Sequence, residues 1–483
     1  MAKILEETAL TFDDVLLVPQ YSEISSRYGP DLSTGTCLGG ISLSVPVLSA
    51  NMDTVTEWEM AEAMARLGGL GIIHRFMSIE EQVRQVEKVK RADNTVIRQP
   101  IVISPQASVG EARDLMESYG VGGIMVTDED LRLLGVLTKR DALFRPDEMQ
   151  VRGCMTPRED LVVMMESDIP IEEAKQVFME NRLEKLPLIN EQGKLVGLVT
   201  AKDIVKQEKY PDATRDEHGN LVVGAAVGTR PEDIERCEAL QAAGVDIYVV
   251  DIAHGHSKHT LDMIKRIRQV HPQAKIVAGN VATYAGTLDL LEAGADVIKV
   301  GVGSGSICIT RIVTGFGVPQ LSAIMESARA CQDFGAGEII ADGGIRRAGD
   351  MVKALAAGAH AVMVGSMVSG TDEAPGFPIT KEGKKYKAIR GMASFTANIE
   401  RKSVDKYPLA EETFDRIVPE GVEAIVPYRG SVREILYQMV GGLRSGLSYA
   451  GAHNLEELRQ NAAFVRITSA GRVESGAHDV ELR

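Results

Sequence analysis

Short apolar runs alternate with amphipathic segments along most of the chain. Each run is continuous in hydrophobicity, is closed by a small or polar residue, and is followed by a helical pattern. Eight such runs occur outside residues 95–206: VPVLSAN, GLGIIH, LVVGAAVG, IYVVDIAH, KIVAGN, VIKVGVG, EIIADGG and AVMVGS. Continuous apolar strands followed by helices are typical of a parallel sheet covered by helices, and eight such units predict a closed (β/α)8 TIM barrel.

The residues that close these runs are unusual for a structural position. In a barrel of this kind the carboxyl ends of the strands carry the chemistry. The set is far more polar and glycine-rich than packing requires, so the sequence predicts a functional site at this face: Asn51, His74, Gly228, Asp251, Asn280, Gly303, Asp342 and Ser366.

Residues 95–206 have a different pattern and contain an internal repeat. Each half predicts a helix, a strand, an acidic turn, a strand and a second helix, and the halves are offset by the 62 positions between Thr138 and Thr200. A Thr followed three residues later by Asp can cap the second helix. Both halves have such a pair, Thr138 with Asp141 and Thr200 with Asp203. We therefore predict an inserted unit at 95–206 between two barrel segments, 1–94 and 207–483.

Composition narrows the function classes. The chain has 483 residues, 44% of them hydrophobic, and no apolar run near the ~18 residues of a membrane span. A net charge of −15 without a basic stripe argues against nucleic acid as a partner. The five cysteines form no CxxC pair, which argues against a disulfide framework or a zinc site. The N-terminus, MAKILEETALTFDD, has no apolar signal region, so we expect a cytoplasmic protein.

Glycine-rich turns follow the last three predicted strands: GVGSGS at 301–306, ADGGI at 341–345 and VGSM at 364–367. Backbone amides of such turns can approach a phosphate closely. The sequence predicts a monophosphate site with Ser306, Gly344, Gly365 and Ser366 as donors. Asp342 would repel phosphate, so we expect it either to accept hydrogen bonds from ribose hydroxyls or to cap the following turn.

Cys308 lies in the first of these loops, within VGVGSGSICITRIVTG. The residues alone leave two interpretations open. It is either a small core residue that follows a strand or a nucleophile presented from a phosphate-binding loop. Cys237 and Cys331 fall in helical patterns and are predicted to be core residues.

Several motifs together resemble one family. GVGSGSICITR, TGFGVPQLSA, IIADGGI, VMVGS and RGMAS, with LTFDDVLLVPQYS and VPEGVE, are similar to the IMP dehydrogenase and GMP reductase family over nearly the whole chain. The inserted repeat resembles a tandem cystathionine-β-synthase (CBS) pair, which implies adenine or guanine nucleotide effectors at Thr138, Asp141, Thr200 and Asp203. The resemblance also implies a homotetramer that CBS pairing can join into an octamer.

The resemblance implies a role for each site residue. Cys308 would attack C2 of a purine nucleoside monophosphate and form a covalent thioimidate, with Thr310 and Glu420 beside the reacting centre. The substrate set would be Met52, Ser306, Asp342, Gly343, Gly344, Gly365, Ser366, Met392, Ala393 and Ser394. The cofactor set would be Asp251, Asn280, Gly301 and Gly303. Potassium would bind the carbonyls of Gly303, Gly305 and Cys308. His254 and His256 have no such role in the family and are predicted to be structural.

The direction of reaction depends on departures from the dehydrogenase pattern. Dehydrogenases have an Arg before a Tyr on a mobile flap, where this chain has Lys406 beside Tyr407, and Lys does not replace a planar Arg. Ile389, Ala393 and Asn51 depart as well. We therefore expect a GMP reductase that uses NADPH. IMP dehydrogenase with NAD stays the alternative, favoured by Tyr407, the flap length and the CBS pair, and a nucleotide sensor without activity is a remote third. The polar segment 381–428 is predicted to be a mobile functional loop.

Overall fold

The structure is a computed structural model that describes residues 4–92, 97, 100–165, 171–404 and 418–476. The chain divides into two compact units. One comprises residues 1–92 and 212–483, and the other comprises residues 93–211. Each unit is described by itself.

A closed barrel of parallel strands forms the first unit, which confirms the predicted fold. Within the described residues eight strands close in the order β12-β13-β14-β15-β16-β17-β4-β5, and β5 pairs with β12 to complete the ring. Each of the eight apolar runs supplies one strand. The strands are β4 (Val47–Ser49), β5 (Leu70–Ile73), β12 (Gly224–Val227), β13 (Ile247–Asp251), β14 (Ile276–Val281), β15 (Val297–Val300), β16 (Glu338–Asp342) and β17 (Ala361–Val364).

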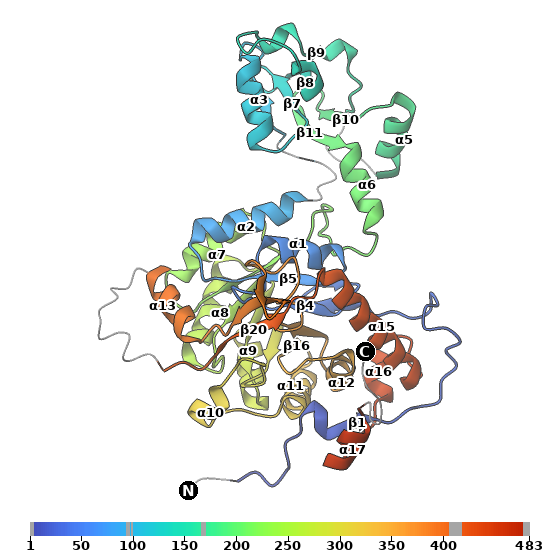
Figure 1. Ribbon diagram of the computed structural model, residues 1–483, viewed down its shortest axis with the longest axis vertical. Helices are drawn as coiled ribbons and strands as arrows, with labels where there is room; N and C mark the ends of the chain where they lie inside the picture. Colours follow the sequence, from blue (N-terminus) through green and yellow to red (C-terminus); the bar gives the residue numbers. More distant parts are fainter. Residues whose placement is uncertain (1–3, 93–96, 98–99, 166–170, 405–417, 477–483) are drawn as a thin grey trace. The chain divides into compact units, whose positions relative to one another are not determined.

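Helices surround these strands, as Figure 1 shows. Every residue of β15 is buried, because a parallel strand is covered by helices on one face and by the barrel interior on the other. The helix α2 buries Val86 and Val89 on its inner face and exposes charged residues on its outer face. The covering helices are α1 (Trp58–Arg66), α2 (Ile79–Ala92), α7 (Asp233–Ala242), α8 (Lys258–Val270), α9 (Tyr284–Glu292), α11 (Gln320–Phe334), α12 (Ala348–Ala356) and α15 (Val432–Ala450).

A hairpin of β2 (Thr36–Leu38) and β3 (Ile41–Leu43) lies against the amino-terminal ends of the barrel strands. A Cβ added at Gly39, in its turn, would lie 3.3 Å from Ile247 and 3.4 Å from Val297, which begin β13 and β15. The hairpin therefore covers the end opposite the polar strand ends. Further elements of this unit are η1 (Phe12–Asp14), the pair β1 (Val15–Leu17) and β21 (Phe464–Arg466), α16 (Leu455–Asn461) and α17 (Ser469–Glu474).

The segment 381–428, predicted as a loop, contains regular structure, so that prediction was wrong in this respect. The strands β18 (Ile379–Lys381), β19 (Lys384–Arg390) and β20 (Glu423–Pro427) form an antiparallel sheet, and α13 (Phe395–Val404) follows β19. In β19 Lys387 and Ile389 are buried, Ala388 between them is exposed, and Tyr386 and Arg390 on either side are half-buried. The lysine on the buried face breaks the alternation of apolar and polar residues, so the sequence pattern alone does not indicate a strand here.

The second unit repeats one motif. The first half has α3 (Val109–Ser118), β7 (Gly123–Thr127), β8 (Leu133–Thr138) and α4 (Lys139–Ala142). The second half has α5 (Ile171–Asn181), β10 (Lys185–Ile189), β11 (Leu195–Thr200) and α6 (Ala201–Lys209). Both hairpins carry a register shift at the equivalent position. The first half also has the short elements β6 (Val102–Ile103), η2 (Val151–Gly153), β9 (Thr156–Pro157) and η3 (Arg158–Asp160).

The two halves of this unit share an apolar cluster, which we call the shared cluster. It consists of Met125, Leu133, Val136, Ile189, Leu195 and Leu198, three from each half. Each half also has a core of its own, one around Ile124 and Leu137 and the other around Leu186 and Val199. The hairpins are thus buried on both faces.

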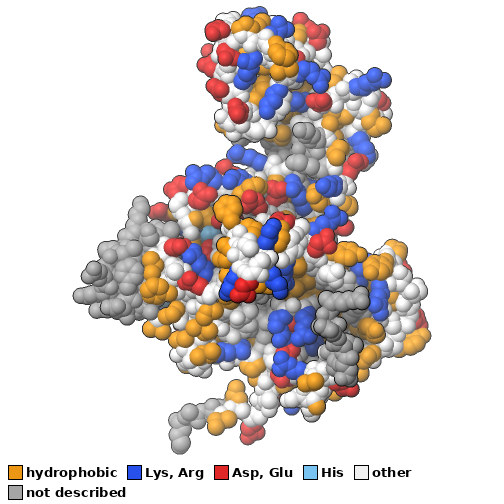
Figure 2. All heavy atoms as spheres, in the orientation of Figure 1, with side chains coloured by type: hydrophobic (Ala, Val, Ile, Leu, Met, Phe, Trp, Pro, Cys, Tyr) orange, Lys and Arg blue, Asp and Glu red, His pale blue; other side chains and the backbone are white. Residues whose placement is uncertain are grey.

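On the face shown in Figure 2, Lys and Arg side chains lie among Asp and Glu side chains on both units. No helix of the described residues is long and apolar enough to cross a membrane.

Candidate active site

A cavity of about 310 Å³ opens at the carboxyl ends of the barrel strands. We call it the mouth cavity. Residues from the ends of β4, β13, β14, β15 and β16 line it, together with residues 391–393 and 420–421. Its volume is at the lower end of the range for small-molecule sites.

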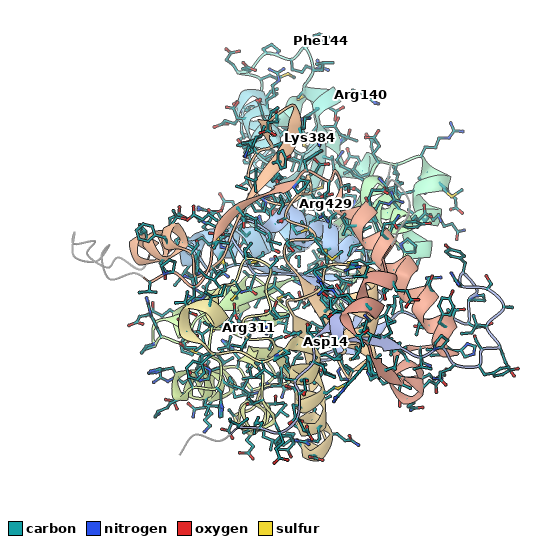
Figure 3. The ribbon with its side chains drawn as sticks, turned by 60° about the horizontal axis from the view of Figure 1, so that its bottom comes forward. Asp14, Arg140, Phe144, Arg311, Lys384 and Arg429 are labelled. Carbon is teal, nitrogen blue, oxygen red and sulfur yellow. The ribbon has the colours of Figure 1, made fainter. Side chains whose placement is uncertain are left out.

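Cys308 lies in the loop between β15 and α10 (Thr310–Thr314) and lines this cavity. Its Sγ is 3.2 Å from Thr310 Oγ1, and its backbone N donates to Gly305 O at 3.2 Å. Arg311, labelled in Figure 3, donates from Nε and Nη2 to Val302 O at 3.3 and 3.2 Å. The guanidinium thereby ties the start of the loop to α10 and fixes the turn that presents the thiol.

Two glycines let the loops after β15 and β16 approach each other. A Cβ at Gly301 (φ +149°) would lie 2.0 Å from Asp342 O, and one at Gly343 (φ +90°) would lie 2.6 Å from Ser304 Oγ. No side chain fits at either position. The two loops are therefore in contact through their backbones, and this brings the cysteine loop beside Asp342.

Backbone hydrogen bonds join three distant segments around the cysteine. Ile309 N donates to Glu420 O at 2.8 Å, Glu420 N donates to Ala393 O at 3.0 Å, and Val422 N donates to Ile307 O at 3.0 Å. This ladder lines the cavity with Met392, Ala393 and Glu420 on the side of Cys308.

On the other side of the cavity a network of buried and half-buried polar side chains runs across five strand ends. Lys299 Nζ lies 2.9 Å from Asp251 Oδ1 and 2.7 Å from Asp342 Oδ2. Asn51 Nδ2 donates to Asp251 Oδ2 at 2.7 Å, and Asn280 Nδ2 donates to Asp342 Oδ2 at 2.9 Å. We call these five residues the lysine network.

The network changes the acidity of its members. Burial opposes ionisation of Asp251, but the Lys299 ammonium and the hydrogen bond from Asn51 outweigh it and hold the pKa of the carboxyl below its usual value. Burial likewise opposes the charge of Lys299, and the two carboxylates outweigh it and raise the pKa of its ammonium. Both partners are therefore charged near neutral pH.

One atom of the network has no partner among the described residues. Asn280 Oδ1 is buried and accepts no hydrogen bond there. Asn280 also lines the cavity, so a ligand that donates a hydrogen bond, such as a carboxamide, would satisfy this acceptor.

The structure brings most of the predicted site residues together. Those that line the mouth cavity are Met52, Asp251, Asn280, Gly301, Gly303, Gly305, Cys308, Thr310, Asp342, Gly343, Met392, Ala393 and Glu420. Five others are not among its lining residues: Ser306, Gly344, Gly365, Ser366 and Ser394. Ser306 is exposed, whereas Ser394 is fully buried, and its backbone N donates to Gly391 O at 2.9 Å. Lys406 and Tyr407 lie outside the described residues.

Sequence reasoning missed two basic residues of the cavity, Arg75 and Lys299. Arg75 directly follows His74. The pattern identifies only the residue that closes each apolar run as a site candidate, so Arg75 is not included. Lys299 was counted inside the apolar run VIKVGVG. A lone lysine inside a strand buried on both faces was the signal that could have identified it, because such a charge needs partners.

Other candidates lie away from the cavity. His256 Nε2 is 2.6 Å from Asp289 Oδ2 on α9, which agrees with a structural role. Cys237 and Cys331 are buried in α7 and α11, as predicted, and burial raises the pKa of their thiols to about 12 and about 11. Neither thiol is suited to act as a nucleophile.

In the second unit Thr138 caps α4 as predicted. Its Oγ1 accepts from Asp141 N at 3.2 Å, and its own N donates to Asp141 Oδ2 at 2.9 Å. Thr200 ends β11 directly before α6, which contains Asp203, whose side chain lies outside the described part of the chain.

Comparison with known proteins gives a consistent family. Residues 9–478 match the IMP dehydrogenase / GMP reductase domain. Inosine-5′-monophosphate dehydrogenase of Aquifex aeolicus is 51% identical over 98% of this chain and 96% of its own length, and that of Nitrosopumilus maritimus is 49% identical over 98% of both. A cysteine-to-alanine variant of GMP reductase from Trypanosoma brucei, solved in complex with guanosine 5′-monophosphate, is 44% identical with a TM-score of 0.91 and covers 98% of both chains.

Proposed function

This chain belongs to the IMP dehydrogenase / GMP reductase family of purine nucleotide oxidoreductases, and we propose that within it the chain is a GMP reductase. It would convert GMP, NADPH and two protons to IMP, NADP⁺ and ammonium. The substrate would lie across the mouth cavity, with its base toward Cys308 and its ribose toward Asp342. The exposed Ser306 and the glycine turns at 343–344 and 365–366 would then meet the phosphate at the open rim.

In the first step the Cys308 thiolate adds to C2 of the purine, and N3 takes up a proton. The C2–N bond to the exocyclic amine then breaks, the nitrogen leaves with a second proton as ammonia, and a thioimidate to Cys308 remains. The 3.2 Å contact between Cys308 Sγ and Thr310 Oγ1 and the bond from Ile309 to the Glu420 backbone support Thr310 and Glu420 as the groups that move these protons.

NADPH, when bound, would supply a hydride to C2. Cleavage of the C2–S bond with loss of the N3 proton would then regenerate the thiolate and leave IMP, and the ammonia would take up a proton to become ammonium. The chain's contribution is to hold the nicotinamide against the purine. Asn280 Oδ1, buried without a partner among the described residues, fits the amide N–H of a carboxamide. Asp251 and the glycines at 301 and 303 line the same cavity.

The observation that carries the choice of a reductase is Asn51. Its amide lines the cavity and donates to Asp251 Oδ2 at 2.7 Å, at a position where the resemblance leads us to expect a small residue or proline in dehydrogenases. Lys406, Ile389 and Ala393 depart from the dehydrogenase pattern in the same direction. The similarity to a GMP reductase over nearly the whole chain agrees with this choice.

The test is a pair of assays on the purified full chain. With GMP and NADPH we expect stoichiometric NADPH oxidation and ammonia release. With IMP and NAD we expect at most slow turnover after a burst, because Lys406 would hydrolyse the thioimidate poorly. Steady formation of XMP at about 1 s⁻¹ or faster, without GMP-dependent NADPH oxidation, would overturn the assignment.

IMP dehydrogenase is the second candidate, because curated relatives that are 51% and 49% identical over nearly the whole chain carry that name. It would require Lys406 to act as the base that activates water. The variant Lys406→Arg separates the two activities. In a reductase this change should not create an efficient dehydrogenase, whereas in a dehydrogenase it should raise the rate of XMP formation.

For residues 93–211 we propose a tandem CBS unit that binds adenine or guanine nucleotides and adjusts activity or assembly. The repeated hairpins and the Thr138–Asp141 cap support this assignment. Deletion of residues 95–206 should leave a folded, active barrel. Loss of all activity in a soluble deletion would contradict the proposal. Sedimentation with and without ATP tests the expected tetramer and its conversion to an octamer.

A further inference from the structure

Lys299 has a position that packing alone does not explain. It lies on β15, its side chain is only 3% exposed, and it points into the barrel interior, where branched apolar residues normally form the layers. Gly279 on the neighbouring strand makes room for it, since a Cβ there would lie 2.7 Å from Lys299 Cβ. A buried ammonium is costly unless carboxylates compensate for it. The position of Lys299 is therefore explained by the carboxylates that it binds and not by packing.

Only one of the two carboxylate oxygens of Asp342 accepts hydrogen bonds from the described residues. Lys299 Nζ and Asn280 Nδ2 both bind Oδ2, at 2.7 and 2.9 Å. No hydrogen bond reaches Asp342 Oδ1 from the residues that the structure describes, although Asp342 lines the cavity. Two donors on one oxygen fix the plane of the carboxylate and leave the other oxygen to accept from a ligand.

Asp251 is held in a complementary way. Lys299 binds its Oδ1 at 2.9 Å, and Asn51 donates to its Oδ2 at 2.7 Å. One ammonium therefore braces two carboxylates from β13 and β16, on the sides where we propose that the cofactor and the ribose bind. Arg75 lines the same cavity and further offsets the excess negative charge.

We infer that Lys299 is a positioning residue that holds Asp342 for the ribose hydroxyls and so sets the requirement for a ribonucleotide. This inference rests on the proposed function only in taking a purine ribonucleotide as the ligand. Lys299 does not touch the reacting atoms. It acts through Asp342, whose free oxygen accepts hydrogen bonds from the vicinal diol.

The experiment measures binding rather than turnover. Full-length protein carrying Cys308→Ala is titrated by calorimetry with GMP and with 2′,3′-dideoxyguanosine 5′-monophosphate, which lacks both hydroxyls. Adding Lys299→Met should weaken GMP binding at least tenfold and leave the dideoxy nucleotide within about twofold. The preference for GMP then falls at least fivefold.

The matched control is Lys387→Met. Lys387 on β19 is equally buried, but its Nζ donates to the carbonyl of Thr371 at 2.9 Å and to that of Ala374, rather than to carboxylates. Its loss removes a buried charge without freeing an aspartate, so the preference for GMP should not change. A preference that falls equally in both variants would show a general effect of losing a buried lysine and would overturn the inference.

Equal weakening of both nucleotides in the Lys299→Met protein, or a preference within twofold of the reference, would also overturn it. If that variant does not fold, the double change Lys299→Met with Asp251→Asn restores the net charge of the trio and decides the question by the same ratio. IMP and its dideoxy analogue give the same comparison if the chain is a dehydrogenase. Failure of the reference protein to bind either nucleotide would instead count against the proposed function.

Discussion

The two sides of the mouth cavity are held by different forces. The cysteine side, formed by residues 301–311, 391–394 and 420–422, is joined by hydrogen bonds between backbone atoms of separate loops. The lysine network on the other side consists of side chains fixed by charge on the ends of barrel strands. Both sides line one cavity. The cysteine side is formed by loops, and the lysine network is formed by residues at the ends of barrel strands.

This difference suggests a division of labour. Loops can adjust as covalent bonds form and break, whereas recognition of a fixed group such as ribose gains from rigid strands. We expect changes on the cysteine side to affect turnover and changes in the lysine network to affect binding and stability. The predictions below test that separation, beginning with the largest effect.

Cys308→Ala should lower kcat by about 10⁴-fold or more, because no other group can form the thioimidate. Binding of GMP should stay within about threefold of the wild type, since the lysine network is untouched. Steady-state kinetics and calorimetry measure the two quantities. Cys37→Ala, at an exposed thiol in the β2–β3 hairpin, is the control and should change neither. Near-normal turnover of Cys308→Ala would exclude the covalent mechanism.

Glu420→Gln should lower kcat by about 10²–10⁴-fold, the usual contribution of a group that transfers protons. The amide is nearly isosteric, so the backbone ladder through residue 420 should remain and KM should change little. Glu423→Gln is the control, because Glu423 lies on β20 and bonds Thr396 Oγ1 at 2.7 Å. A rise in KM at constant kcat for Glu420→Gln would instead place this residue in binding.

The lysine network should become unstable in acid. Lys299 and Asn51 hold the pKa of Asp251 low, so its contribution to stability is present above the unfolded pKa of about 3.9 and is lost as pH falls through the lower folded value. The raised pKa of Lys299 makes its contribution present below about pH 10.4 and lost as pH rises through the folded value.

In Lys299→Met the acid midpoint of unfolding should move up by about one pH unit, since burial of Asp251 is no longer opposed by an ammonium. Near-UV circular dichroism against pH measures this. Lys387→Met should leave the midpoint unchanged, because among the described residues Lys387 bonds carbonyls and no carboxylate. An equal shift in both variants would mean that the ion pairs are not the cause.

The smallest expected effect is that of potassium on the cysteine side. The carbonyls of Gly303, Gly305 and Cys308 are the predicted ligands, and Gly305 O already accepts from Cys308 N at 3.2 Å. Replacing potassium by a large organic cation should slow turnover a few-fold, about 1 kcal/mol in the barrier, without changing GMP binding. Unchanged rates would remove the ion from the mechanism.

The barrel was predictable because parallel strands buried on both faces give continuous apolar runs, and each strand end could be identified by its polar residue. The same rule does not identify Lys299, because this residue lies inside VIKVGVG, a run that is otherwise apolar or glycine. Pairing of Lys299 with Asp251 and Asp342 joins β13, β15 and β16, and nothing in the local pattern specifies which strand ends meet across a barrel.

The cysteine side was less accessible to physical reasoning. The contact between Cys308 and Thr310 follows from their spacing at a helix start, but Met392 and Glu420 were assigned by resemblance alone. Their position depends on backbone bonds such as that between Glu420 and Ala393, which no side-chain pattern encodes. The strand β19 was missed because Lys387 occupies a buried position.

The shared cluster of the 93–211 unit has a consequence for how that unit melts. Three apolar side chains from each repeat form it, including Leu133 and Leu195, so a separated repeat would expose an apolar patch to water. Neither repeat can open alone without uncovering the other. The two halves should therefore exchange their slowest amide protons at a common rate, and a gene cut between them should yield fragments that associate or aggregate rather than two independent miniature domains.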